Sequence, residues 1–229
     1  MNERKHIVVL TGAGISAESG LKTFRDSDGL WNGYDVREVA TPGAWKRNPE
    51  LVLDFYNQRR RDVAAASPNQ AHLDLAALEQ QFAVSIITQN IDDLHERAGS
   101  NRVLHLHGEI FKMRSELDTE KTYPVFGDMQ PGALAEDGGL LRPNIVWFEE
   151  PVPMMEQAMK LMNDCDLFVI IGTSLQVYPA ASLLHYAPPF LPIYLIDRKI
   201  PDVNLPANCT CIEMPATKGV RELTRLLHP

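Results

Sequence analysis

Cysteine and net positive charge are both scarce in this sequence. Three of its 229 residues are cysteines, Cys165, Cys209 and Cys211. Three are too few for a disulfide framework, and this number fits a reducing compartment. The formal net charge is −8, which argues against stable binding to nucleic acid and is compatible with basic, lysine-rich protein partners.

Long apolar segments are also missing. No run is long enough to span a bilayer, and residues 1–6 lead into a short apolar segment without the features of a signal peptide. We therefore expect a cytoplasmic protein that does not bind membranes. With 45% hydrophobic and 23% charged residues, the composition is that of an ordinary soluble protein. The length suits a single catalytic domain over residues 1–229 with a small inserted lobe.

Short apolar runs alternate with helix-like patterns. The runs are rich in β-branched residues and predict strands buried on both faces of a parallel sheet; they cover residues 7–10, 84–88, 167–171 and 193–196. Helix-spaced apolar residues cover 51–63, 70–81, 154–163 and 219–227, with Asn69 and Thr217 as predicted N-caps. This alternation predicts an α/β fold with a Rossmann-like, doubly wound parallel sheet.

Two irregular segments interrupt the alternation. Residues 19–49 are long for a simple loop, and residues 112–142 are rich in Gly, Pro, Asp and Glu. We predict that residues 112–142 form the small inserted lobe. Long irregular segments of compact domains are often functional.

A Gly-x-Gly motif at Gly12 and Gly14 follows the first predicted strand. Such glycines allow a tight turn and a close approach of the backbone to phosphate, with the following helix pointing its N-terminus at a pyrophosphate. A dehydrogenase would next need a strand ending in an acidic residue. The chain instead has a polar segment with Phe24, Arg25 and Trp31, which disfavours hydride transfer. These side chains either cover a cofactor or anchor the local core.

Polar residues follow the second predicted strand. Gln89, Asn90 and Asp92 lie at its carboxyl end, where parallel sheets bind ligands. They could orient a ribose, a carboxamide and a water molecule, while Asp92 could equally begin a helix over residues 94–98.

Residues 104–109 alternate like a strand, which would place His105 and His107 on one face. A histidine there could act as a general base near neutral pH or be structural. Gly108 would allow the chain to turn and expose His107. The small residues Gly172, Thr173 and Ser174 follow the third strand and suit a second nucleotide contact. Asp197 closes the fourth strand, where it could accept a ribose hydroxyl or be an ordinary acidic residue at a strand end.

Taken together, these motifs resemble the sirtuin family. The matching stretches occur in the family's order over most of the chain, at residues 12–20, 23–25, 29–31, 88–96, 106–109, 142–148, 172–174 and 177–180. The resemblance implies an NAD-consuming protein lysine deacylase. Nicotinamide would leave the ribose, the acyl oxygen would attack the anomeric carbon, and His107 would activate a ribose hydroxyl. The products would be free lysine, nicotinamide and O-acyl-ADP-ribose.

The resemblance also assigns residues. His107 and Asn90 would be catalytic. NAD would be bound by Gly12, Ala13, Gly14, Ile15, Ser16, Ala17, Phe24, Arg25, Trp31, Gln89, Asn90, Ile91, Asp92, Gly172, Thr173, Ser174, Asp197, Lys199 and Ala216. The family usually has Asn where this chain has Asp197. An extended substrate peptide would add as a strand between Val146, Trp147 and Phe148 on one side and Val177 and Tyr178 on the other.

Tyr56 and Arg59 lie three residues apart on a predicted helix and therefore share a face. A hydroxyl and a guanidinium can bind a carboxylate through charge-assisted hydrogen bonds, and sirtuins that remove succinyl and malonyl groups carry such a Tyr-x-x-Arg pair. The resemblance thus implies a desuccinylase and demalonylase that also deacetylates. The alternative is a solvated basic face, since Arg60 and Arg61 follow.

The family's structural zinc has no counterpart in this sequence. Residues 112–142 contain no cysteine, and Cys209 and Cys211 have the wrong spacing for a zinc knuckle. We predict no structural zinc, so the lobe would be mobile or held by packing, through Tyr123, Val125, Phe126 and Leu134. The family's Phe-Gly-Glu segment reads Phe148-Glu149-Glu150 here, which could alter peptide docking.

Two other classes remain open. An NAD glycohydrolase or ADP-ribosyltransferase would use the same nicotinamide pocket, although the Tyr56 and Arg59 pair disfavours it. An NAD sensor without turnover is disfavoured by Asn90, Asp92 and His107. The sequence leaves the oligomeric state and the protein targets undetermined.

Overall fold

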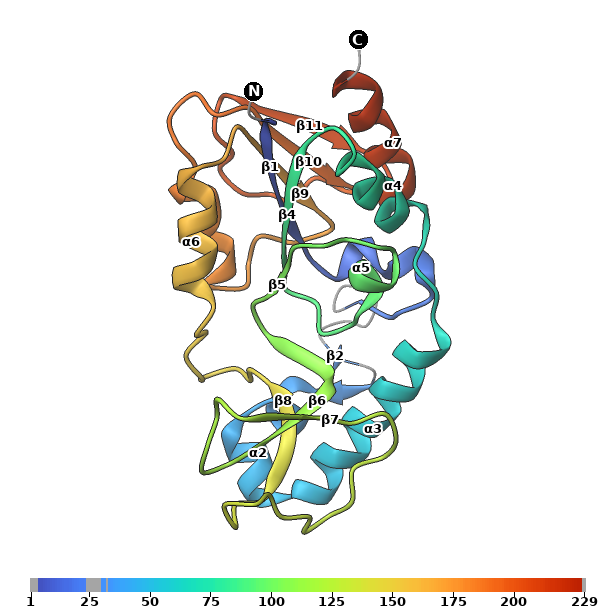
Figure 1. Cartoon of the computed structure of the whole chain (residues 1–229), viewed down its shortest axis with the longest axis vertical. Coiled ribbons are helices and arrows are strands. Elements are labelled where there is room, and N and C mark those ends of the chain that lie inside the picture. Colours follow the sequence, from blue (N-terminus) through green and yellow to red (C-terminus); the bar gives the residue numbers. More distant parts are fainter. Residues whose placement is uncertain (1–3, 24–29, 32, 228–229) are drawn as a thin grey trace.

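A six-stranded parallel sheet forms the upper part of the molecule (Figure 1). The computed structural model describes residues 4–23, 30–31 and 33–227. The strand order is β11-β10-β9-β1-β4-β5. The strands are β1 (His6–Thr11), β4 (Ala83–Thr88), β5 (Val103–His105), β9 (Leu167–Ile171), β10 (Ile193–Asp197) and β11 (Cys209–Glu213). The four predicted strands are confirmed, because each is a buried apolar run.

The chain changes direction across the sheet beside β1. It first builds outward through β4 and β5, and later returns to the other side of β1 with β9, β10 and β11. Thr11 at the end of β1 lies in register with Thr88 of β4 and Ile171 of β9. Ligands of open α/β sheets bind where the strand order reverses in this way.

Helices cover both faces of this sheet (Figure 1). Ile7 and Val9 pack toward α4 (Gln70–Leu78) and α7 (Ala216–Leu227). Val8 and Leu10 pack toward α6 (Met155–Asn163) and the 3-10 segment η4 (Ala180–Tyr186). The doubly wound arrangement predicted from the sequence is therefore present.

Two details of the predicted helices were wrong. α4 ends at Leu78 and not at residue 81, because residues 79–81 form a tighter turn closed by bonds such as Gln81 N–H to Leu78 O. Asn69 does cap α4, accepting from Ala71 N–H. Thr217 is no N-cap, because α7 already begins at Ala216.

A second, smaller part of the molecule lies below the parallel sheet in the view of Figure 1. It contains an antiparallel sheet in the order β7-β6-β8, formed by β6 (Gly108–Ser115), β7 (Thr122–Pro124) and β8 (Leu141–Ile145). Its core is shared with helices from the irregular N-terminal region, α1 (Val36–Val39), α2 (Pro42–Arg47) and α3 (Pro49–Ala65), which follow the short hairpin of β2 (Leu30–Trp31) and β3 (Tyr34–Asp35). The predicted segment 112–142 covers most of this sheet, and its role as a separate lobe stays a prediction.

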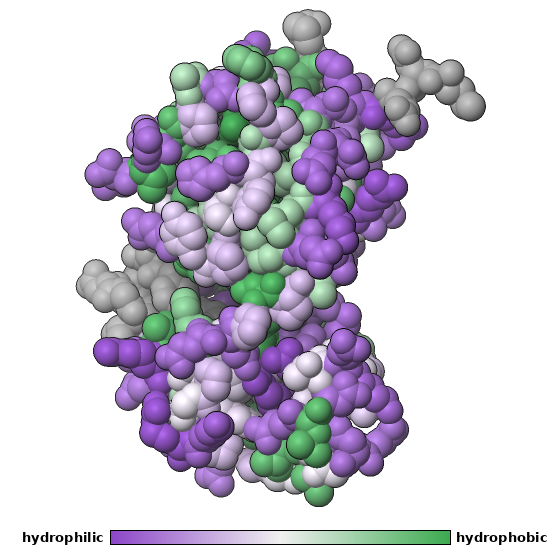
Figure 2. Space-filling model, turned by 90° about the vertical axis from the view of Figure 1, so that its left-hand side faces the viewer, coloured by the Kyte–Doolittle hydropathy of each residue, from purple (hydrophilic) through white to green (hydrophobic). Residues whose placement is uncertain are grey.

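The packing predicted for this lobe was wrong for two of its four residues, and Tyr123 is half-buried. Val125 does contact the core, but the side chains of Phe126 and Leu134 are 82% and 60% exposed. Figure 2 shows apolar side chains at the surface near the free end of the lobe, below a constriction of the molecule. The apolar residue types of this segment therefore predicted more burial than the structure shows.

Polar groups hold the lobe together. The Arg142 guanidinium donates to both oxygens of Glu150, at 2.7 and 3.0 Å, and stacks 3.3 Å from the ring centre of Trp147. Arg114 lies 3.6 Å from the same carboxylate. Burial alone would raise the pKa of Glu150, but its bonds with Arg142 outweigh this and lower it.

The helix α3 is tied to the lobe by backbone contacts. Asn57 exchanges two hydrogen bonds with the backbone of Met129, and Arg60 donates to Ile110 O at 2.9 Å.

Over the residues that the structure describes, no group of three or more His, Cys, Asp or Glu side chains is placed to hold a metal ion. Within the same residues, no helix has the length and apolarity needed to cross a membrane.

Candidate active site

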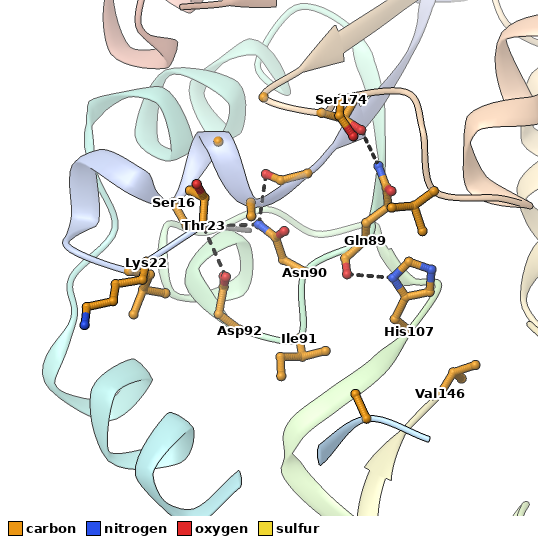
Figure 3. Close-up of a pocket in the computed structure, with 18 of the residues that line it drawn as sticks. Ser16, Lys22, Thr23, Gln89, Asn90, Ile91, Asp92, His107, Val146 and Ser174 are labelled. Atoms are coloured by element: carbon orange, nitrogen blue, oxygen red, sulfur yellow. Dashed lines mark hydrogen bonds between the residues drawn. The ribbon is translucent and has the colours of Figure 1, made fainter. Parts of the chain in front are cut away.

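A cavity of about 460 Å³ lies between the carboxyl ends of the parallel strands and the lobe. The loops that follow β1, β4, β9 and β10 line one side of it, and α3 and residues 145–150 line the other. Figure 3 shows side chains from these loops converging on the cavity. Segments far apart in the chain therefore form one site.

The glycine loop after β1 packs directly on the loop after β9. Gly14 N–H donates to Gly172 O at 2.8 Å, and Gly172 has a positive φ of 63°. A Cβ on Gly172 would lie 2.5 Å from Ile15 N, so the contact admits no side chain. The regular helix predicted after Gly14 is absent, and two 3-10 turns, η1 (Ala13–Ile15) and η2 (Ala17–Ser19), take its place.

Glu18 of η2 caps the distant helix α7. Its carboxylate accepts from the Thr217 N–H at 3.0 Å and from the Thr217 hydroxyl at 2.8 Å. The cap of α7 thus comes from another part of the chain, which explains the failed prediction for Thr217. The same contact ties the glycine loop to α7, whose first residue, Ala216, lines the cavity.

Ser16, Asn90 and Asp92 form a buried hydrogen-bonded group at the inner end of the cavity (Figure 3). The Asn90 amide donates to Gly12 O and Ser16 Oγ, both at 3.2 Å, and Ser16 Oγ donates to Asp92 at 3.1 Å. The other Asp92 oxygen accepts from Leu94 N–H at the start of α5 (Leu94–Arg97). Asp92 therefore binds the first N–H of α5, whose N-cap residue is Asp93, and also lines the cavity, and burial raises its pKa.

Gln89 bridges two neighbouring loops. Its side-chain amide donates to Thr173 Oγ1 at 3.0 Å, and its backbone carbonyl accepts from His107 Nδ1 at 2.9 Å (Figure 3). A carbonyl only accepts, so the proton of His107 sits on Nδ1 and leaves Nε2 as an acceptor. Burial lowers the pKa of His107. The cavity therefore holds a neutral imidazole in the tautomer that a general base requires.

His105 and His107 do not share a face, contrary to the sequence prediction. The strand breaks between β5 and β6, and Gly108 takes a positive φ of 84° against β8. His105 instead contacts Asn90 O at 3.0 Å and Glu96 at 2.7 Å, and lines a separate cavity of about 330 Å³. Burial lowers the pKa of His105, but Glu96 outweighs this and raises it.

Tyr56 and Arg59 of α3 line the main cavity from the lobe side. Their exposed fractions are 0% and 6%, so Arg59 does not belong to a solvated basic face. Arg60 is also buried, whereas Arg61 is exposed and pairs with Asp128. Burial raises the pKa of Tyr56 well above its ordinary value and lowers that of Arg59.

The expected peptide-binding residues surround the same cavity. Those that line it are Val146, Trp147, Phe148, Val177 and Tyr178. Trp147 is buried, whereas Tyr178 is largely exposed. The N–H groups of Val146 and Phe148 already donate to His107 O and Ala40 O, so a peptide strand cannot use these two donors.

Most of the expected NAD residues also line the cavity. They are Gly12, Ala13, Gly14, Ser16, Gln89, Asn90, Ile91, Asp92, Gly172, Thr173, Ser174, Asp197, Lys199 and Ala216. Ile15 and Ala17 are not among its lining residues, and Ile15 is buried in the core below. Phe24, Arg25 and the Trp31 side chain lie outside the described part of the structure.

Several lining residues were missed by the sequence reasoning. Lys22, Ala40 and Arg198 are examples. Arg198 lies between the predicted site residues Asp197 and Lys199, and Lys22 lies two positions before Phe24, so their sequence positions could have suggested them. Ala40 is a small residue in an irregular segment, and no local pattern distinguishes it.

Comparison with known proteins gives consistent relatives. Residues 12–179 match the profile of the Sir2 family. An NAD-dependent protein deacylase of Helicobacter pylori is 55% identical over 219 residues, covering 96% of each chain. A protein of the same name from Bacteroides thetaiotaomicron is 49% identical over 231 residues, covering 98% of this chain and 99% of the relative.

Solved structures of Sir2 proteins superpose on this chain over nearly its whole length. The crystal structure of a Sir2 homologue with NAD superposes with a TM-score of 0.87 at 39% identity, covering 98% of this chain and 90% of that one. A mutant Sir2 homologue with ADP-ribose gives a TM-score of 0.83 at 38% identity, covering 98% and 94%. A Sir2 protein with a deacetylated p53 peptide and 3′-O-acetyl ADP-ribose gives 0.81 at 31% identity, with the same coverage.

Proposed function

We propose that this chain, which belongs to the Sir2 family and is an NAD-dependent protein deacylase, removes succinyl and malonyl groups from protein lysines in addition to acetyl groups. The observation that carries this proposal is the location of Tyr56 and Arg59. Both are buried side chains that line the cavity containing His107. An acyl group that reaches the cavity from the lysine side would meet a hydroxyl and a guanidinium.

Burial of the Arg59 guanidinium has a free-energy cost that a substrate carboxylate would reduce. Burial lowers its pKa, which means that leaving water disfavours the charged form, and the charges of Asp62 and Asp92 offset this only in part. A carboxylate beside the guanidinium would offset more of the cost through a charge-assisted hydrogen bond. An acetyl group has no such carboxylate, so the pair would discriminate by the charge of the acyl group.

The residues on the sheet side fit NAD. The loops of Gly12 and Gly172 bring bare backbone to the cavity. Ser16, Asn90 and Asp92 present a hydrogen-bonded polar group at its inner end. Asp197, Lys199 and Ala216 line it near the carboxyl end of β10. NAD would supply a ribose carbon that loses nicotinamide and accepts the acyl oxygen.

His107 would then take a proton at Nε2 from a ribose hydroxyl. Its Nδ1–H bond to Gln89 O keeps the ring oriented and Nε2 unprotonated. Asn90 would hold the ribose or a water molecule, because its amide is fixed by Gly12 O and Ser16. Peptide residues beside the lysine would lie between residues 146–148 and Val177 with Tyr178.

The test is mass spectrometry of matched succinyl-, malonyl- and acetyl-lysine peptides incubated with NAD. We expect loss of all three acyl groups, with faster removal of succinyl and malonyl, and formation of O-acyl-ADP-ribose. His107→Ala should suppress all three reactions. Release of ADP-ribose at an equal rate without any acyl peptide would favour an NAD glycohydrolase instead. Removal of acetyl alone would refute the proposed acyl preference.

A further inference from the structure

The turn that follows β8 is held in one conformation. Trp147 N–H donates to the Glu150 carboxylate at 2.8 Å, and Glu150 N–H donates back to Trp147 O at 3.1 Å. The same carboxylate is bound by Arg142 at 2.7 and 3.0 Å. This turn encloses Phe148 and Glu149, so the backbone of Glu149 has little freedom to move.

Glu149 occupies a conformation that favours glycine. Its φ is +73°, in the left-handed region, where a side chain collides with its own backbone. Glycine would adopt this φ without strain. Non-glycine residues kept in such regions are concentrated at functional sites, and the outlier here lies on the wall of the active-site cavity.

The Glu149 side chain is available to a ligand. It is exposed and lines the cavity, and among the described residues it has neither a hydrogen-bond partner nor an ion pair. Its neighbour Glu150, in contrast, is occupied by two arginines. The cavity thus has an unpaired carboxylate beside Phe148 and a buried guanidinium, that of Arg59, on its α3 side.

The backbone N–H of Glu149 is a second group that a substrate could bind. From Val146 to Glu150, four N–H groups already donate within the protein, to His107 O, Glu150 Oε2, Ala40 O and Trp147 O. The N–H of Glu149 has no such acceptor among the described residues. A substrate carbonyl bound there would place a neighbouring substrate side chain beside the Glu149 carboxylate.

We propose that Glu149 is a specificity-determining residue that favours acyl-lysines flanked by lysine or arginine. This inference rests on the proposed function, because it needs a peptide substrate in the cavity. The carboxylate would attract a cationic side chain one or two positions from the acyl-lysine and repel an acidic one. Glu149 would act on the binding of flanking residues, whereas Tyr56 and Arg59 would act on the acyl group.

The test compares two peptides that carry the same acyl-lysine, with arginine or glutamate at the flanking positions. For wild type we expect kcat/KM to be about fivefold higher for the basic peptide at low salt, the size typical of an exposed charge pair. High salt should reduce this ratio, because the pair is exposed. Glu149→Gln, which keeps the backbone, and Glu149→Gly, which relieves it, should both bring the ratio close to one.

Glu136→Gln is the matched control. Glu136 is an exposed carboxylate of the lobe that pairs with Lys121 and does not line the cavity. This variant should keep the wild-type ratio. An unchanged ratio in Glu149→Gln, or no preference in wild type, would overturn the inference.

The kcat/KM ratio of the basic and acidic peptides should be measured twice, once with acetyl-lysine and once with succinyl-lysine. If the ratio persists while succinyl is not preferred, then the acyl proposal alone fails. If succinyl is preferred without any effect of the flanks, then the role of Glu149 alone fails. The two proposals can therefore be rejected separately.

Discussion

The indole N–H of Trp147 donates a 3.1 Å hydrogen bond to the hydroxyl oxygen of Tyr56, although the two residues are 91 positions apart. An indole N–H can only donate, so the Tyr56 oxygen is the acceptor of this bond. The Arg142 guanidinium stacks on the Trp147 ring, 3.3 Å from the ring centre. The bond thereby orients the hydroxyl that we assign to the acyl group.

Arg59→Met should slow the removal of succinyl groups far more than the removal of acetyl groups. Removing a charge-assisted hydrogen bond to a buried carboxylate should lower kcat/KM for succinyl-lysine by about 10- to 100-fold, with a much smaller change for acetyl-lysine. Arg61→Met is the control, because Arg61 lies on the same helix but is exposed and bound to Asp128. Equal losses on both substrates would reject the role of Arg59.

Tyr56→Phe should affect both stability and specificity. The substitution leaves the Trp147 N–H without its acceptor in a buried site, which should cost about 1–2 kcal/mol in the free energy of unfolding. It should also reduce succinyl removal more than acetyl removal. Urea denaturation and the two peptide assays measure these effects. A stability loss with unchanged acyl selectivity would limit Tyr56 to a structural role.

The pH dependence should reflect a histidine with a lowered pKa. Burial lowers the pKa of His107 below its ordinary value of 6.5, so the neutral form needed for proton abstraction is complete at pH 7.5. We expect kcat/KM to stay level from pH 8 to 7 and to fall only below pH 6.5. His107→Ala should lower the rate by about 10²- to 10⁴-fold. An acidic limb with a midpoint above pH 7 would contradict this assignment.

His72 should make the fold sensitive to acid. The side chain is fully buried, and burial lowers its pKa from 6.5 to about 4. The unfolded chain therefore binds the proton first, so stability is complete above pH 6.5 and is lost as the pH falls toward 4. A shift of this size corresponds to roughly 3 kcal/mol.

Thermal unfolding across this pH range provides the test. His72→Gln should flatten the pH dependence of the melting temperature, whereas His185→Gln should leave it unchanged because His185 is exposed. If the melting temperature depends on pH to the same degree in the His72 and His185 variants, then carboxylates account for the acid sensitivity. The neighbouring His95, 4.9 Å away between ring centres, is buried with a lowered pKa and should contribute in the same direction.

Glu150→Gln should destabilise the lobe. The Glu150 carboxylate joins Arg142, Arg114 and the Trp147 backbone, and its loss leaves two mostly buried guanidiniums without their anion. We expect a decrease of about 2 kcal/mol in the free energy of unfolding, and faster proteolysis between residues 116 and 140. Glu136→Gln removes an exposed carboxylate and should change neither. Equal effects of the two variants would show that the buried network does not hold the lobe.

Local sequence patterns were sufficient for four strands of the parallel sheet, β1, β4, β9 and β10, and for the loops that follow them, but not for β11 at its edge. A strand such as β9 is an apolar run buried on every residue, and burial of this kind is visible in hydrophobicity alone. The glycines and polar residues that end the strands also follow from position, because parallel strands direct their carboxyl ends to one edge. Most of the residues expected to bind NAD line the cavity for this reason.

Contacts between distant segments were decided only by the tertiary structure. Thr217 is bound by Glu18 from the other end of the chain, and no local pattern encodes such a partner. His105 and His107 differ by two positions, yet a break in the strand sends them to different cavities. Phe126 is apolar but exposed, whereas Arg59 is charged but buried. Residue type thus determined the buried strands and main helices of this protein, and the packing of all its elements decided which side chains meet.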